Sequence, residues 1–268
     1  PTHLNQRLVF LSPPRSMTSD RKAEQAGVGR LGLCAGCSYF PDYLNSRRCT
    51  PGDACIRAHS GRQIDRFLRA NPELAHNYLR DIFWERRAIA ARYAAVDAIF
   101  ALKSDADEVV RRVVATRLPV DQLISMVGDP DREVRLSVAA RLPEPLLVKL
   151  LGDPDYLIRA TVARRLPHGQ LSKLCKDPER EVRKVVAARL PPFALHMLAG
   201  DPEPEVRAIV AERALPGLAA TLLKDEEWWV RLAAVGNAPL EFLPPLIADP
   251  EVEVREAAQA RLAEESDI

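Results

Sequence analysis

The chain has 268 residues, of which 47% are hydrophobic and 28% charged, a composition that supports a sizeable core and excludes an intrinsically disordered tail. Its 38 lysines and arginines nearly balance its 37 aspartates and glutamates, which argues against a surface made for nucleic acid or membrane along the whole length. The balance is uneven, because residues 1–80 carry 12 basic and 6 acidic side chains (+6) and residues 81–268 carry 26 basic and 31 acidic ones (−5).

No uncharged stretch reaches the roughly 18 to 20 apolar residues that a membrane helix needs, and the first residues lack the order of a secretory signal. We therefore expect a cytoplasmic protein without membrane contact. The chain has five cysteines. Four of them crowd between Cys34 and Cys55, which in a reducing compartment indicates metal binding rather than disulfides.

The four cysteines form the pattern Cys-x2-Cys-x11-Cys-x5-Cys. Two thiolates separated by two residues can bind one centre from a single turn, and Gly36 lets the backbone close around it. Pro41, Pro51 and Gly52 supply the turns that return the other pair, and a segment with few apolar residues needs such a staple to fold. The predicted ligands are Cys34, Cys37, Cys49 and Cys55.

The spacing alone leaves two cofactors open. A structural zinc site usually has two to four residues inside its second cysteine pair, whereas five residues separate Cys49 from Cys55. Iron–sulfur clusters are wider and tolerate looser spacing. Either centre carries two negative charges with its thiolates, which nearby arginines can offset: Arg30, Arg47, Arg48 and Arg57.

The rest of the chain is a repeat with a period of 24 residues, in which an aspartate is followed six residues later by an arginine. The first unit, 81–104, is divergent, because Arg86 stands in its aliphatic position. The regular aspartates are Asp105, Asp129, Asp153, Asp177, Asp201, Asp225 and Asp249, and the arginines are Arg111, Arg135, Arg159, Arg183, Arg207, Arg231 and Arg255.

Each unit predicts one helix of about three turns and one short segment. In the unit that starts at Asp177, the aspartate is expected to cap the helix with Pro178 in its first turn. The helix must end before Pro191, and the nine remaining residues allow one short α or 3₁₀ turn. We expect the arginines to join adjacent units by charged hydrogen bonds, including a second row at 117, 141, 165, 189, 213 and 261 that Asn237 interrupts.

Departures from the repeat mark candidate partner contacts. Trp228 and Trp229 stand where other units have charged or small residues, and Tyr156 occupies the position that matches Trp228. Tryptophan and tyrosine are enriched at binding hot spots, although a terminal repeat can also repack around bulky side chains. Cys175 falls in a position held elsewhere by aliphatic residues, so we expect it to be buried in the core.

Stacked units of this kind predict an all-α solenoid in which each repeat contacts chiefly the next. We expect residues 1–80 to form a small cysteine domain and residues 81–268 to form about eight repeats. The cysteine block and the repeats together resemble the leucine-rich repeat variant proteins that carry an N-terminal [4Fe–4S] cluster. The resemblance implies a right-handed superhelix of alternating α and 3₁₀ helices without strands. It also implies that Cys34, Cys37, Cys49 and Cys55 bind an iron–sulfur cluster, with structural zinc as the alternative.

We expect a protein-interaction scaffold and not an enzyme. All four cysteines are committed to the centre, and the chain lacks a Gly-rich phosphate loop and an HExxH motif. The cluster either staples the N-terminal domain or makes partner binding respond to redox state or oxygen. Two alternatives are a nucleic-acid-binding regulator that uses the basic N-terminal region and an electron-transfer protein.

Overall fold

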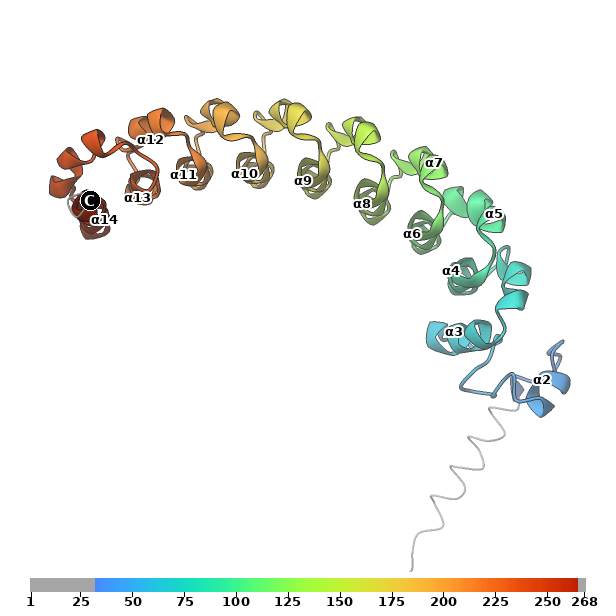
Figure 1. Ribbon diagram of the computed structural model, residues 1–268. Coiled ribbons are helices and arrows are strands. Elements are labelled where there is room, and N and C mark those ends of the chain that lie inside the picture. The colour runs from blue at the N-terminus through green and yellow to red at the C-terminus, as the bar shows by residue number, and fades with distance from the viewer. Residues whose placement is uncertain (1–31, 265–268) are drawn as a thin grey trace, which may run out of the picture. The chain divides into compact units, whose positions relative to one another are not determined.

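The computed structural model describes residues 32–264, which form helices joined by short turns (Figure 1). Within that range the only β pairing is an isolated bridge between Thr50 and Ala54. The chain divides into two compact units between Leu102 and Lys103. The prediction of an all-α protein without strands is confirmed for the described residues.

The first unit contains the cysteine segment and the divergent first repeat. The amphipathic helix α3 buries Ile64, Phe67 and Leu68, and helix α4 packs against it. For this reason the compact unit continues past residue 80 and includes α4, whose first residue Trp84 follows Asp81 by three positions. The helices of this unit are α2 (Asp42–Asn45), α3 (Gly61–Ala70), η1 (Pro72–Tyr78), α4 (Trp84–Tyr93) and α5 (Val96–Ile99), and η2 (Phe100–Ser104) crosses the division.

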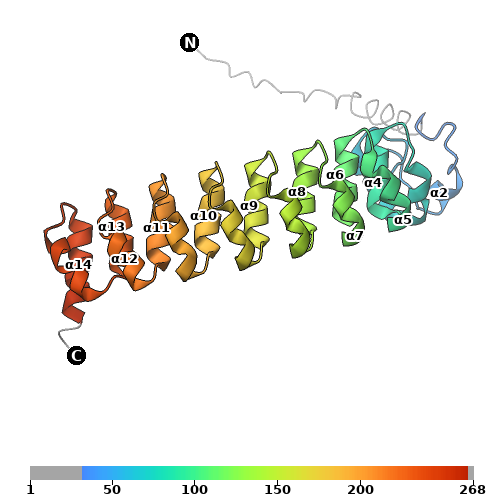
Figure 2. The ribbon, with the colours of Figure 1, turned by 90° about the horizontal axis from the view of Figure 1, so that it is seen from above.

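The second unit alternates long α-helices with short helical segments, and seen by itself it is a curved stack with the long helices along the inner side (Figures 1 and 2). The long helices are α6 (Glu108–Arg117), α8 (Arg132–Arg141), α9 (Tyr156–Arg165), α10 (Arg180–Arg189), α11 (Pro204–Arg213), α13 (Trp228–Val235) and α14 (Val252–Glu264). The short ones are α7 (Val120–Leu123), η3 (Ile124–Met126), η4 (Glu144–Leu150), η5 (His168–Leu174), η6 (Pro192–Leu198), α12 (Pro216–Leu222), η7 (Leu240–Phe242) and η8 (Pro244–Ala248).

One unit illustrates how the sequence sets these elements. Helix α10 has ten residues and ends with Leu190 as its C-cap, because Pro191 disfavours α geometry at the residue before it. The seven-residue 3₁₀ helix η6 follows and buries Leu195 and Leu198. The predicted length of the helix, its end and the short second segment are therefore confirmed.

The predicted start of the helix is wrong by two residues. The N-cap of α10 is Glu179, and no side chain caps this helix; Pro178 thus lies outside the helix. The Asp177 carboxylate accepts the N–H of Glu179 at 2.9 Å in a bend before the helix. Its other contacts go to Arg159 of the preceding repeat, so the aspartate that recurs every 24 residues connects adjacent repeats. Side-chain N-caps do occur two residues later in three units: Asp107, Asp131 and Asp155.

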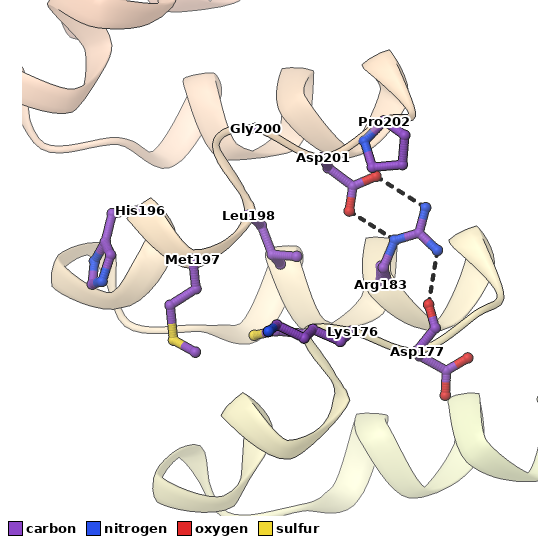
Figure 3. A pocket seen from close by; sticks show the side chains of 10 residues that line it. Lys176, Asp177, Arg183, His196, Met197, Leu198, Gly200, Asp201 and Pro202 are labelled. Atoms are coloured by element: carbon purple, nitrogen blue, oxygen red, sulfur yellow. Dashed lines mark hydrogen bonds and ion pairs between the residues drawn. The ribbon is translucent and has the colours of Figure 1, made fainter.

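Six ion pairs, four of them buried and two part-buried, join successive repeats, and we call them the Arg–Asp ladder. Arg183 donates through Nε and Nη2 to both oxygens of Asp201 in the next repeat, at 2.7 and 3.0 Å. Its Nη1 donates to the carbonyl of Asp177 in its own repeat at 2.8 Å (Figure 3). The arginine thereby fixes two turns with one planar group. The pairs are Arg111–Asp129, Arg135–Asp153, Arg159–Asp177, Arg183–Asp201, Arg207–Asp225 and Arg231–Asp249.

The second arginine row points backwards along the chain. Arg189 donates to the carbonyls of Ala163 and Leu166, at the C-terminal end of the helix in the preceding repeat, at 2.6 and 2.8 Å. These carbonyls lack a partner within their own helix. Asn237, which interrupts the row, keeps the same role, because its amide donates to the carbonyls of Ala211 and Glu212. Both rows confirm that the repeats are joined by hydrogen bonds from their arginines.

Between these polar connections lies a continuous apolar core. Val182, Val186 and Ala187 of α10 are fully buried, as are their equivalents in the neighbouring repeats. Cys175 is 5% exposed among them, as predicted. None of the helices within residues 32–264 is both long and apolar enough to cross a lipid bilayer.

Candidate metal centre

The first two cysteines lie in one tight turn. The N–H of Cys37 donates to the carbonyl of Cys34 at 3.1 Å, which brings both thiols to one side of the backbone. Gly36 makes this turn possible, because its φ of +68° lies in the left-handed region that costs a side-chain-bearing residue free energy.

The other two cysteines are placed by separate turns. The N–H of Cys49 donates to the carbonyl of Tyr43 at 3.1 Å, so the chain folds back after α2. The bridge between Thr50 and Ala54 then closes a loop around Gly52, whose φ is +77°. Cys55 follows and donates its N–H to the carbonyl of Gln63 in α3 at 3.1 Å.

These turns bring all four predicted cysteines to one small cavity. Cys55 is buried and the other three are partly exposed. The rest of the lining is apolar or aromatic: Leu33, Tyr39, Phe40, Pro51, Ile56 and Phe67. A ring of thiols beside apolar and aromatic side chains is the donor set for a soft metal centre.

The thiols influence one another electrostatically. Burial, followed by the neighbouring Cys55 and Cys37, raises the pKa of Cys34, and only the guanidinium of Arg57 opposes this shift. Burial and the same group of thiols raise the pKa of Cys49. Four thiolates in this space therefore repel one another, and a bound cationic centre offsets that repulsion while it releases the thiol protons.

Arg57 also connects the two halves of the cysteine segment. Its Nη1 donates to the carbonyl of Ala35 at 2.8 Å. Arg57, two residues after Cys55, therefore holds the turn between Cys34 and Cys37. Of the other arginines proposed to offset the charge, Arg48 lies over the Tyr43 ring at 4.4 Å, and Arg30 lies outside the described residues. The side chain of Arg57 thus offsets the negative charge of the thiolates and also holds the turn that carries Cys34 and Cys37.

The side chains that support the cavity from beneath were not predicted from the sequence. Tyr39, Tyr43 and Phe67 form an aromatic cluster with ring centroids 4.9 to 6.4 Å apart. Asn71 is fully buried and donates to the carbonyls of Arg48 and Phe67 at 2.9 and 2.8 Å. The aromatic residues between the cysteines were the available signal, whereas nothing in the spacing identified Asn71.

Comparison with known proteins supports both parts of this description. The family model described as "LRV protein FeS4 cluster" matches residues 28–77, and the one described as "Leucine rich repeat variant" matches residues 132–155 and 180–203. A solved structure described as "a leucine-rich repeat variant with a novel repetitive protein structural motif" is 53% identical, with a TM-score of 0.80. The match covers 85% of this chain and 98% of that one.

The chain belongs to the leucine-rich repeat variant family. A curated relative of this repeat variant is the "uncharacterized 27.7 kDa protein in nifB 3'region" of Rhodobacter capsulatus, 40% identical over 92 residues. The matched segment covers 34% of this chain and only 37% of that relative's length. The family model that matches residues 28–77 spans all four cysteines, so the repeat variant has the region in which members hold an FeS4 cluster.

The donor atoms of this repeat variant are of the kind that such a centre uses. Four thiols, the donors that iron–sulfur clusters and structural zinc both use, line one cavity. Within residues 32–264 no three His, Cys, Asp or Glu side chains lie close enough together to hold a single metal ion. His59 is exposed and its ring meets Phe83 edge-on at 6.5 Å, so it does not belong to the cavity lining.

The predicted partner-contact residues of the repeat variant lie at two places in the second unit. Trp228 and Trp229 begin α13 and meet edge-to-face at 5.9 Å, and Trp229 is 38% exposed. Tyr156 is 39% exposed at the start of α9. Since three repeats separate Tyr156 from Trp228, these aromatic residues do not form one site.

Proposed function

We propose that the protein is an interaction scaffold that holds a [4Fe–4S] cluster on Cys34, Cys37, Cys49 and Cys55 and presents its repeats to a protein partner. The observation that carries the cofactor assignment is that all four thiols line one cavity in the segment that matches the FeS4 family model. The five residues between Cys49 and Cys55 favour the cluster over zinc.

The repeats support the binding role. A stack of α-helices joined by the Arg–Asp ladder offers an extended surface whose residues recur at fixed intervals. Other solenoid proteins bind their partners on surfaces of this kind. In this proposal all four thiols bind the cluster, which leaves no iron position open to a substrate. The protein then acts by binding and not by catalysis.

The position of the cavity favours a response to redox state or oxygen. Three of the four cysteines are partly exposed, and Phe40, which lines the cavity, is 48% exposed. Small oxidants and electron donors therefore reach the centre readily. When bound, the cluster supplies one-electron chemistry and ties the turns of the cysteine segment together, and its loss releases those turns.

The cofactor is tested on protein purified without oxygen. We expect a brown sample with iron and acid-labile sulfide in equal amounts, about four of each per chain as the cluster formula requires. Its broad absorption in the visible range should bleach when dithionite reduces the cluster. A colourless sample with one zinc per chain would contradict the cluster assignment.

The scaffold and its response are tested by capture of partners with loaded and stripped protein. Anaerobic pull-downs use the full chain with its cluster, the same chain after chelation, and a matrix control. We expect a protein that is retained by the loaded chain and released on stripping. Equal retention by both forms would reject the response while it supports the scaffold, and the absence of any retained protein would reject the scaffold.

A further inference from the structure

Helix α10 begins with an arginine that neutralises two glutamates of the next repeat. The Nη1 of Arg180 lies 3.5 Å from a carboxylate oxygen of Glu203 and 3.6 Å from one of Glu205. Both glutamates lie at the start of α11, and the guanidinium also contacts Glu181 beside it at 3.7 Å. One planar cation on the surface thus serves three carboxylates.

Two repeats later the same carboxylates recur without the arginine. The positions 48 residues after Glu203 and Glu205 hold Glu251 and Glu253. The position 48 residues after Arg180 holds Trp228. Helix α14, which carries Glu253 near its start, packs against α13, which begins with the tryptophans. The arginine position of the repeat is therefore filled by an aromatic ring, while its acidic neighbours remain.

The nearby cations are engaged elsewhere. Arg231 is 12% exposed and donates through two nitrogens to Asp249 at 2.8 Å as part of the Arg–Asp ladder. Arg255 donates to the backbone carbonyls of Asp249 and Pro250. Neither of them takes the part that Arg180 plays two repeats earlier. Glu253 is exposed, and Glu251 is partly exposed.

We infer that Trp228, Trp229, Glu251 and Glu253 form a binding site for an arginine side chain of a protein partner. The guanidinium lies against the exposed indole of Trp229 and pairs with the two carboxylates, as Arg180 pairs with Glu203 and Glu205. Arginine fits better than lysine, because its planar group both stacks on an aromatic face and donates to several carboxylates. This assignment rests on the proposed scaffold function and names the chemistry of the partner.

The site is tested by titration of the cluster-loaded full chain with a short glycine–arginine peptide of two arginines. The readout is the indole N–H signals in ¹H–¹⁵N spectra at low salt. We expect shifts of the Trp228 and Trp229 signals, with Trp84 of the first unit as an internal control that does not move. Otherwise identical peptides with lysine or citrulline should bind more weakly, and added salt should weaken the arginine peptide.

Substitutions locate the contacts. Trp229→Ala should weaken binding about two- to five-fold, the range of a surface cation–π contact, and the double substitution of Glu251 and Glu253 by Gln should abolish it. The matched control replaces Glu203 and Glu205 by Gln, where Arg180 already occupies the position, and should leave the peptide affinity unchanged. Circular dichroism checks that each variant is folded.

Trp228→Arg is the sharpest variant, because it restores the arginine that α10 has at this position. The new side chain should pair with Glu251 and Glu253 within the chain and so exclude the peptide without loss of helical structure. Binding of the citrulline peptide as tightly as the arginine peptide, or unchanged binding to folded Trp228→Arg, would overturn the assignment. A protein that the wild type and folded Trp228→Arg retain equally would overturn the arginine site while it leaves the scaffold function standing.

Discussion

The cysteine segment and the repeat array reach their folded states in different ways. In residues 32–60 the chain has one four-residue helix and left-handed φ angles at Gly36, Arg47 and Gly52, and its connections are single ones, such as that from Arg57 to Ala35. In residues 103–264 each connection is repeated in neighbouring units. We therefore expect the segment to depend on a bound metal centre for order, whereas the array distributes its stability among equivalent interfaces.

The substitution with the largest expected effect should destabilise the cysteine segment and leave the repeat array unchanged. Cys55→Ser removes a buried thiol that we propose as a cluster ligand, so we expect loss of the cluster and of the stabilisation it provides, on the order of 10 kcal/mol if it matches structural metal sites. Hydrogen exchange should accelerate in residues 32–60 and stay unchanged in residues 103–264.

The matched control is Cys175→Ser, which alters a buried core position in the array. It should leave the iron content unchanged and destabilise only the second unit. Retention of a full iron complement by Cys55→Ser would show that the two regions do not differ in the way described.

The next effect concerns the Arg–Asp ladder. Arg135→Met leaves Asp153, whose side chain is 2% exposed, without its partner, and removal of one member of a buried pair costs about 3–5 kcal/mol. Urea unfolding should show this loss. Arg132→Met, three residues earlier in α8, removes a side chain that is 51% exposed and should cost less than about 1 kcal/mol. Equal losses would mean that the ladder is not the main connection between repeats.

A smaller effect depends on pH and should appear only in the array. The hydrogen bond from Arg112, together with those from Val134 and Glu133, lowers the pKa of Asp131 to about 2 from its usual 3.8. Because the folded pKa lies below the unfolded one, this stabilisation is present above about pH 4 and is lost as the pH falls through 2. It amounts to at most about 2 kcal/mol, because the Arg112 side chain is 39% exposed and solvent screens the pair.

Thermal unfolding between pH 2 and pH 5 measures this contribution. Asp131→Asn should show a shallower decline with acid than the wild type, although Asp225 and Asp249, whose pKa values are also lowered, keep some of it. Parallel curves for the two proteins would contradict the assignment to Asp131.

The smallest effect returns to the cysteine segment. Gly36→Ala forces a side-chain-bearing residue to a φ of +68°, which costs about 1–2 kcal/mol and should appear as weaker retention of the metal against a chelator. Gly32→Ala is the control, because an added Cβ there meets nothing within 4 Å and its φ is not left-handed. Similar retention by both variants would show that the turn tolerates other backbone angles.

The repeat could be predicted from sequence because its information is periodic. Five of the seven registers have a proline fourteen residues after the aspartate, which determines where the helix ends, and the structure confirms α10 and η6 on that basis. The helix start was placed wrongly at Asp177, since an aspartate before a proline resembles an N-cap. Its carboxylate instead binds Arg159 of the preceding repeat, a contact that one repeat viewed alone does not reveal.

The sequence predicts which four cysteines lie at one cavity but not the surroundings of that cavity. The close pair Cys34 and Cys37 follows from local spacing, and the cavity that includes Cys49 and Cys55 agrees with it. The contacts of Asn71 and the position of Phe67 depend on how α3 packs. Such contacts between segments have no characteristic spacing, so a single sequence does not specify them.

The unbroken register has a consequence for how such a surface can change. Because the repeats share one 24-residue register, the equivalent position in another repeat is found by adding or subtracting 24 from a residue number, so a recognition feature can be moved between repeats. The separation of two binding epitopes on the array can therefore change only by whole repeats, and each epitope keeps its position within its repeat.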